Sequence, residues 1–202
     1  MTMRRAVASA PSRDRDLLQL VPLFRALPPA LLGELAGRLR PVRMSARTTI
    51  FQTDDVGSKL YIIIKGAVKI FIPSPEGREV VLAIQRAGDL FGEMSLLDNQ
   101  PRSASAVTLE ESEMVSLNRV DFEEVLERHP EACRAVLEVL VSRLRQTNQS
   151  VQDAYLLDVP GRLARRLLIL MRDHGVQTES GTEIGLKMSQ QDLASMIGAS
   201  RV

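Results

Sequence analysis

Apolar residues near the start of the chain recur at the three- and four-residue spacing of helices. Between residues 16 and 39 the repeating residue is mainly leucine, and the pattern is interrupted at Pro22 and again at Pro28 and Pro29. Because proline is excluded from helix interiors, this stretch predicts a few short helices instead of one long helix. Residues 1–15 are expected to form a disordered tail.

Between Val42 and Leu117 the spacing changes to short runs rich in β-branched residues. The runs cover residues 48–51, 60–64, 68–72 and 80–84, and turn residues lie at 65–66, 73–77 and 87–89. Runs of this length bounded by glycine and proline are typical of strands. The pattern therefore predicts an antiparallel barrel or sandwich.

The helical spacing returns after Asn118, first in a short helix that His129 and Pro130 end. Residues 131–157 then contain neither glycine nor proline, which predicts one helix about 40 Å long. A set of its residues follows the alternating steps of three and four of a two-stranded coiled coil: Leu137, Leu140, Leu144, Thr147, Val151 and Ala154. We expect two chains to dimerise along this helix. The alternative is a long helix that packs on its own barrel.

Residues 158–161, of sequence Asp-Val-Pro-Gly, predict a break after the long helix and a hinge between two domains. A second helix is expected from residue 162 to about residue 173, followed by a hairpin or loop within 175–185. Ser189 is a favourable N-cap, and Asp192 can complete a capping box. Ala194 and Gly198 then fit the first helix and turn of a helix-turn-helix.

Composition mainly excludes functions. Apolar residues make up 45% of the chain and charged residues 25%, and the net charge of +1 does not by itself indicate a nucleic-acid-binding surface. One cysteine, Cys133, and two histidines exclude a disulfide framework and an iron–sulfur cluster and argue against a metalloenzyme. Residues 1–20 lack the uninterrupted apolar stretch that a signal peptide or membrane helix requires. We expect a cytoplasmic protein of two domains, with no metal and no catalytic site.

Residues 91–106 contain the candidate binding chemistry. Arg102 offers paired donors that suit a phosphate, and Ser103 adds a hydroxyl. Glu93 can accept hydrogen bonds from a sugar hydroxyl, and Gly92 allows a close backbone approach. These residues suit the two polar ends of a nucleotide. The alternative, from spacing alone, is that Glu93 and Arg102 pair with each other at a barrel turn.

The ordered segment from Phe-Gly-Glu-Met-Ser-Leu-Leu at 91–97 to Pro-Arg-Ser-Ala at 101–104 resembles the phosphate-binding cassette of the cyclic AMP receptor protein and fumarate-nitrate reduction regulator family of bacterial transcription factors. The resemblance extends from Pro-Leu-Phe at 22–24 to Asp-Val-Pro-Gly-Arg at 158–162. Asp54 stands where the family commonly has glycine. Aspartate tolerates left-handed geometry, so we expect the turn to be kept.

The resemblance implies an α+β fold in three parts. A cyclic-nucleotide-binding β-barrel, or jelly roll, with flanking short helices would occupy residues 16–130, a dimerisation helix 131–157, and a winged helix-turn-helix 158–202. Because the sequence stops at Val202, inside what would be the recognition helix, we expect only part of this last domain. We therefore expect no specific DNA binding by these 202 residues.

The resemblance also implies cyclic AMP as the effector, with no cofactor, and assigns its contacts. Arg102 and Ser103 would hold the cyclic phosphate and Glu93 the ribose 2′-hydroxyl. The expected ligand-binding residues are Leu82, Ala83, Gly92, Glu93, Met94, Ser95, Arg102, Ser103, Arg143, Thr147 and Asn148. Thr147 and Asn148 would read the purine, one within the subunit and one across the dimer. Thr147 as a register-setting residue without ligand contact is the alternative.

The expected DNA contacts are Ser189, Gln191, Ser200 and Arg201. Ligand binding would reposition the DNA-binding domain, and the complete protein would bind double-stranded DNA as a homodimer, with RNA polymerase as a further partner. Three alternatives stay open. They are a regulator of the same fold that senses another effector or none, a short form that dimerises without specific DNA binding, and a barrel-fold enzyme.

Overall fold

The computed structural model describes residues 28–75, 77–186 and 188–199, and its strands form a barrel of two antiparallel sheets. One sheet has the order β1-β8-β3-β6 and the other β2-β7-β4-β5. The strands are β1 Arg40–Met44, β2 Thr49–Phe51, β3 Lys59–Lys65, β4 Ala67–Pro73, β5 Glu79–Arg86, β6 Leu90–Phe91, β7 Ser105–Thr108 and β8 Ser112–Asn118. This confirms the predicted jelly roll. The expected tail and first helices, Ser200 and Arg201 lie outside the described residues.

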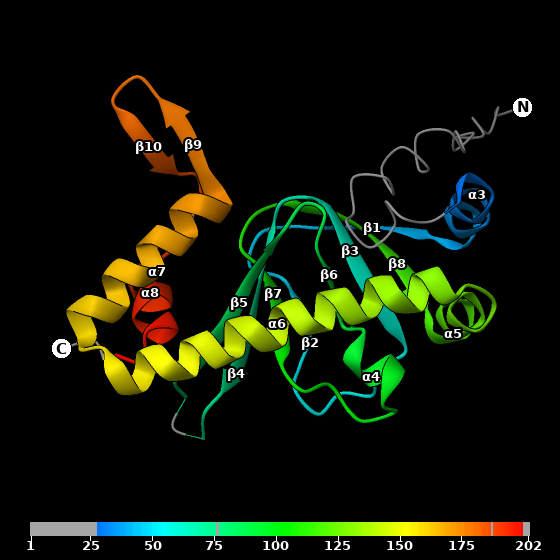
Figure 1. The fold of residues 1–202 in the computed structure, drawn as a ribbon, viewed down its shortest axis with the longest axis horizontal. Helices are drawn as coiled ribbons and strands as arrows, with labels where there is room; N and C mark the ends of the chain where they lie inside the picture. Colours follow the sequence, from blue (N-terminus) through cyan, green and yellow to red (C-terminus); the bar gives the residue numbers. More distant parts are fainter. Residues whose placement is uncertain (1–27, 76, 187, 200–202) are drawn as a thin grey trace, which may run out of the picture.

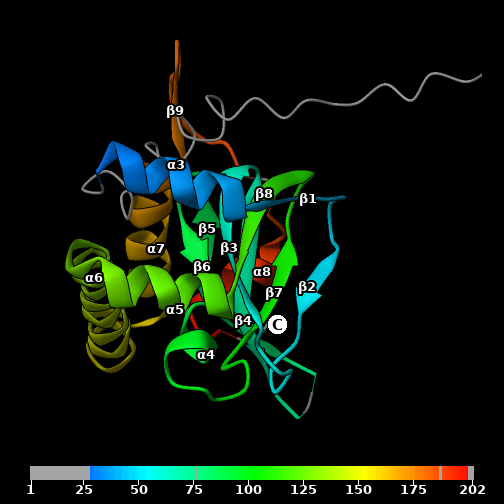
Figure 2. The same cartoon turned by 90° about the vertical axis from the view of Figure 1, so that its right-hand side faces the viewer.

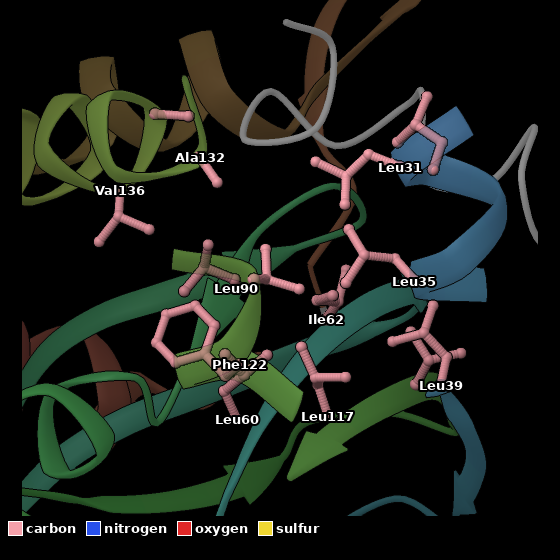
Figure 3. Packing of buried hydrophobic residues seen from close by; sticks show 14 of the residues in the cluster. Leu31, Leu35, Leu39, Leu60, Ile62, Leu90, Leu117, Phe122, Ala132 and Val136 are labelled. Carbon is pink, nitrogen blue, oxygen red and sulfur yellow. The ribbon is translucent and has the colours of Figure 1, made fainter. Parts of the chain in front are cut away.

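Strand β3 is apolar on both faces because it has core on both sides. Successive side chains of a strand point to opposite faces, so Leu60 and Ile62 join one hydrophobic cluster while Ile63 joins another inside the barrel. The first cluster lies between the sheet and helices α3 (Pro29–Arg38), α5 (Arg119–Arg128) and α6 (Pro130–Leu156). Figure 3 shows Leu31 and Leu35 of α3 on one side of this cluster and Val136 of α6 on the other, with Leu90 and Ile62 between them. These helices therefore close one side of the barrel.

Helix α6 is 27 residues long and lies along the barrel (Figure 1). It begins and ends one residue earlier than the predicted helix of residues 131–157. Its N-terminal part is buried, whereas its later apolar residues are exposed. Together with the polar Asn148 they form a line that we call the exposed stripe: Leu137, Val141, Leu144, Asn148, Val151 and Tyr155. The stripe departs from the predicted seam at three of its six positions, with Val141, Asn148 and Tyr155 in place of Leu140, Thr147 and Ala154, and Leu140 packs against the core instead. No helix in the described part of the chain is long and apolar enough to cross a membrane.

The second predicted helix, α7 (Val159–His174), begins three residues before the expected start. The chain breaks at the extended Leu157 and Asp158, where the Asp158 side chain accepts a hydrogen bond from the Gly161 N–H at 2.9 Å. Pro160 therefore lies in the first helical turn, where its missing N–H costs nothing. The predicted hairpin follows as β9 (Gly175–Thr178) and β10 (Gly181–Ile184), which projects from the end of α7 in Figure 1.

Helix α8 (Gln190–Met196) carries the predicted capping box of Ser189 and Asp192, and Gly198 takes a positive φ of 63° in the turn that follows. Residues of α7 and α8 pack against strands β4 and β5 in a third hydrophobic cluster that includes Val81, Leu170 and Met196. Figure 2 shows this C-terminal unit behind the barrel strands, with α3 and α5 nearer the viewer. The helix-turn-helix unit and the barrel are thus in direct contact.

Candidate functional site

Arg102 lies between α4 (Met94–Leu97) and β7, and its guanidinium is buried. Nη1 donates to the Gly92 carbonyl at 2.5 Å and to Ser95 Oγ at 2.8 Å, and Nη2 donates to the Lys59 carbonyl at 2.6 Å. The guanidinium carbon also lies 4.2 Å from the centre of the Phe51 ring. Burial lowers the pKa of Arg102, yet an arginine stays charged at neutral pH. A single cation therefore joins the starts of β3 and α4.

The backbone of Arg102 is held in place by hydrogen bonds to the turn that contains Asp54 and Asp55. Asp54 adopts the predicted left-handed conformation, with φ 70°, and its N–H donates to the Arg102 carbonyl at 2.9 Å. In return the Arg102 N–H donates to the Asp55 carbonyl at 2.9 Å. The turn is therefore kept although Asp54 replaces the glycine common in the family. Its hydrogen bonds fix the segment that carries Arg102.

Two glycines allow this packing. At Gly92, with φ 80°, an added Cβ would lie 2.7 Å from Arg102 Nη1. At Gly57 an added Cβ would lie 2.1 Å from Ser95 Oγ, closer than real Cβ atoms come. Gly92 was predicted to permit a close approach, but Gly57 was not. The sequence indicates the role of Gly57 only through its position, two residues before strand β3.

Glu93 is also buried, at 1% exposure, and it reaches helix α6. Its Oε1 accepts a hydrogen bond from Nη1 of Arg143, whose Nη2 donates to the Leu90 carbonyl. Glu93 Oε2 is buried with no hydrogen-bond partner within the described structure. The alternative in which Glu93 pairs with Arg102 is therefore wrong, and a buried acceptor oxygen is left available to a hydroxyl donor.

The predicted ligand-binding residues on and near the short helix α4 differ in burial. Ser95 is buried and accepts the bond from Arg102, so it positions the guanidinium as well as shaping the helix. Met94 and Ser103 are exposed, and the Ser103 hydroxyl lies 3.8 Å from the Met94 sulfur. Arg119, which the sequence did not single out, donates to the Gly57, Ser95 and Leu96 carbonyls at 2.7–3.0 Å. It ties α4 to the loop before β3.

Leu82 and Ala83 lie on β5 at a β-bulge. Ala83 pairs with Ile70 and Val81 pairs with Phe71, so Leu82 is the extra residue and is exposed. Ala83 shares the inner face of the barrel with Ile70, since directly opposed residues point the same way. Leu82 is therefore at the rim and Ala83 inside.

Thr147 and Asn148 are both exposed on α6 but face different directions. Thr147 follows Arg143 by four residues and so shares its face of the helix, which meets the barrel at Glu93. Asn148 lies on the exposed stripe with Leu144 and Val151.

Two of the candidate DNA contacts, Ser189 and Gln191, lie within the described residues. Both are exposed at the start of α8, and the Ser189 hydroxyl donates to Asp192 at 2.7 Å.

Comparison with known proteins agrees with this architecture. Residues 41–129 match the cyclic nucleotide-binding domain and residues 161–202 the Crp-like helix-turn-helix domain. The chain is 37% identical over 186 residues to a CRP-like cAMP-activated global transcriptional regulator of Mycobacterium tuberculosis, covering 92% of this chain and 83% of that protein. It is 36% identical to a global nitrogen regulator of Synechocystis, covering 94% and 84%.

Solved structures give the same result. The catabolite activator protein of Thermus thermophilus superposes with a TM-score of 0.61 at 31% identity, over 89% of this chain and 81% of that one. The c-di-GMP responsive global regulator of Xanthomonas campestris superposes with a TM-score of 0.72 at 26% identity, over 81% and 82%. With the sensor barrel, the long helix and the helix-turn-helix unit all matched, the chain belongs to the CRP-like family of transcription regulators.

Proposed function

We propose that this chain is a dimeric transcription regulator that binds cyclic AMP between its barrel and α6 and thereby repositions its helix-turn-helix domain. The observation that carries the proposal is the charge of Arg102. Its hydrogen bonds go only to neutral acceptors, and within the described residues it forms no ion pair. The carboxylates of Glu93 and Asp55 act on Arg102 only from beyond ion-pair distance. A buried cation without a direct counterion is costly, and a cyclic phosphate would supply a negative charge in contact with it.

Glu93 supports the sugar end of the same ligand. Its free Oε2 is buried and can accept from a hydroxyl, while Oε1 stays bound to Arg143. Arg143 thereby connects the ribose position to α6. The residues present fit a cyclic nucleotide, which would add its phosphate charge to Arg102 and its hydroxyl to Glu93.

The purine contacts follow from the two directions on α6. Thr147 lies on the face of Arg143 and suits a contact within the subunit. Asn148 lies on the exposed stripe, which in a dimer would face the second chain. The stripe repeats at steps of four and three, and it includes exposed Leu137, Leu144 and Val151. These features support a parallel pairing of α6 with its copy.

Ligand binding would act by shifting populations, with no bond made or broken, since the relatives are transcription regulators and not enzymes. Cyclic AMP is favoured over other effectors because a relative at 37% identity is described as cAMP-activated. The alternative is another effector. Relatives described as a nitrogen regulator and as c-di-GMP responsive favour it.

The first prediction concerns Arg102→Leu. Cyclic AMP at 100 times its dissociation constant should stabilise the unmodified protein by about 2.7 kcal/mol, because it binds only the folded chain. Arg102→Leu should abolish this stabilisation, measured as the shift in melting temperature with and without nucleotide. Arg128→Leu, at an exposed arginine of α5, is the control and should keep the full shift.

Titration calorimetry with cyclic AMP, cyclic GMP and c-di-GMP distinguishes the alternatives. Tightest binding of cyclic AMP supports the proposal. Binding of c-di-GMP alone would replace cyclic AMP as the effector, and an undiminished shift in Arg102→Leu would overturn the assignment of the phosphate to Arg102.

A further inference from the structure

Strands β4 and β5 present an outer face that the sensor barrel does not use for its own core. We call it the docking face: Lys69, Phe71, Glu79, Val81 and Ile84. The bulge at Leu82 explains why both Val81 and Ile84, three residues apart on one strand, belong to this face. Phe71 pairs with Val81 and Lys69 pairs with Ile84, so residues on both sides of the bulge point outward together.

Helices α7 and α8 cover the docking face with apolar side chains. Val81 is buried against Leu170 of α7 and Met196 of α8, and Phe71 and Ile84 are partly buried in the same cluster. Arg86, at the end of β5, also donates to the Asp173 carbonyl of α7. The C-terminal unit therefore contacts the barrel through both nonpolar and polar groups.

Lys69 is the charged group at the centre of this contact. Its side chain is 10% exposed, and Nζ lies 2.6 Å from Glu79 Oε2 and 2.8 Å from Asp192 Oδ1. Burial by itself would lower the pKa of Lys69, but its hydrogen bonds to Asp192 and Glu79 outweigh burial and raise it. One ammonium thus joins a carboxylate of the barrel to a carboxylate of the helix-turn-helix unit.

Asp192 has a second role in α8. Its Oδ2 accepts from the Ser189 N–H at 3.0 Å and from the Ser189 hydroxyl at 2.7 Å, which completes the capping box. The residue that starts α8 is therefore the residue that Lys69 holds. The same contact leaves Ser189 and Gln191 exposed.

We propose that Lys69 is a positioning residue that fixes α8 on the docking face through Asp192, and that this contact couples the nucleotide pocket to the helix-turn-helix unit. Strand β5 provides the connection, because Ala83 points into the barrel while Val81 and Ile84 contact the C-terminal unit. The coupling rests on the proposed function. The positioning of α8 by Lys69 does not.

Amide hydrogen exchange of the full chain tests the positioning without nucleotide. Lys69→Met leaves the partly buried Asp192 carboxylate without its cation, so exchange in α8 should rise about tenfold or more, while α3 and α5 stay unchanged. Lys65→Met, at an exposed lysine of β3, is the matched control and should have no effect on α8. Unchanged exchange in α8 of Lys69→Met would overturn the proposal.

A double-variant comparison separates the ion pair from the capping box. Lys69→Met and Asp192→Asn should each speed exchange in α8, and the two together should speed it no more than the larger single effect. If the two effects multiply instead, Lys69 and Asp192 act independently and the pair does not position α8.

Adding cyclic AMP tests the coupling. In the unmodified protein, saturating nucleotide should change exchange in α8, and in Lys69→Met this change should be lost although the nucleotide still binds. An equal change in both proteins would overturn the coupling. If cyclic AMP binds neither protein, the proposed function fails, while the nucleotide-free comparison still decides the role of Lys69.

Discussion

At the scale of single residues, the candidate site depends on glycines as much as on charged groups. Gly57 leaves the space that Ser95 occupies when it accepts the bond from Arg102. A methyl group there would displace Ser95 and remove one of the acceptors that orient the guanidinium. The position of Arg102 is thus set partly by a residue that has no side chain.

Gly57→Ala should therefore lower both stability and nucleotide affinity. Overpacking of this kind costs about 1–3 kcal/mol, which would appear as a lower melting temperature and a weaker affinity in calorimetry. Gly33→Ala in α3 is the matched control, because nothing lies within 4 Å of the added Cβ. It should stabilise the chain by up to about 1 kcal/mol, since alanine is the better helix former. Equal melting temperatures for the two variants would contradict the packing argument.

The sequence predicted the charged residues of the site better than their partners. Arg102 and Glu93 were identified from residue type and order, and both are buried together at one end of the barrel. The acceptors of Arg102 are mostly backbone carbonyls, which any residue supplies and which no pattern marks. Lys69 was missed because a lysine within a strand normally points to solvent, and only the tertiary contact with Asp192 gives it a partner.

At the scale of elements, the four predicted strand runs and the long helix lie within two residues of the observed bounds, whereas β1, β6, β7 and β8 had no bounds from the sequence. A further difference arose where tertiary contacts choose between adjacent residues. Leu140 and Val141 are both apolar and both fit a helical stripe, but the barrel core takes Leu140 and leaves Val141 exposed. The start of α7 was placed late because Pro160 suits the first turn of a helix as well as its end.

The exposed stripe of α6 predicts the oligomeric state. Leu144→Glu places a charge in the centre of the expected dimer seam, so sedimentation analysis should show a monomer at concentrations where the unmodified chain is a dimer. Gln146→Glu adds the same charge at an exposed position beside the stripe and should remain a dimer. A dimer of unchanged affinity in Leu144→Glu would mean that α6 pairs through another face or not at all.

At the scale of the whole molecule, one arginine links the end of α6 to the turn of the helix-turn-helix. Arg162 Nη1 donates to the Leu157 carbonyl at 3.0 Å, and its Nε donates to the Ile197 carbonyl at 2.8 Å. These two carbonyls follow the last turns of α6 and α8, where helices lack internal partners. A rotation of the end of α6 would therefore move the turn at Gly198.

Arg162→Met should loosen the C-terminal unit while leaving the barrel intact. Hydrogen bonds to a charged group contribute about 1.5–3 kcal/mol each, so the variant should melt earlier and lose exchange protection in α8 before the barrel strands. Arg172→Met is the control, because Arg172 is exposed and, among the residues that the structure describes, bonds only to its neighbour Asp173. Parallel loss of protection in barrel and α8 would show that Arg162 has only a general structural role.

The bulge at Leu82 also determines which length changes β5 tolerates. Removing that one residue would leave Val81 and Ala83 adjacent and opposite Phe71 and Ile70, so both would keep their faces and the ladder would lose only the local twist of the bulge. Adding a residue to the regular part of β5 would instead shift its register by one, so that side chains now inside the barrel would point outward. Natural variants of this regulator should therefore tolerate the loss of Leu82 better than a residue added to β5.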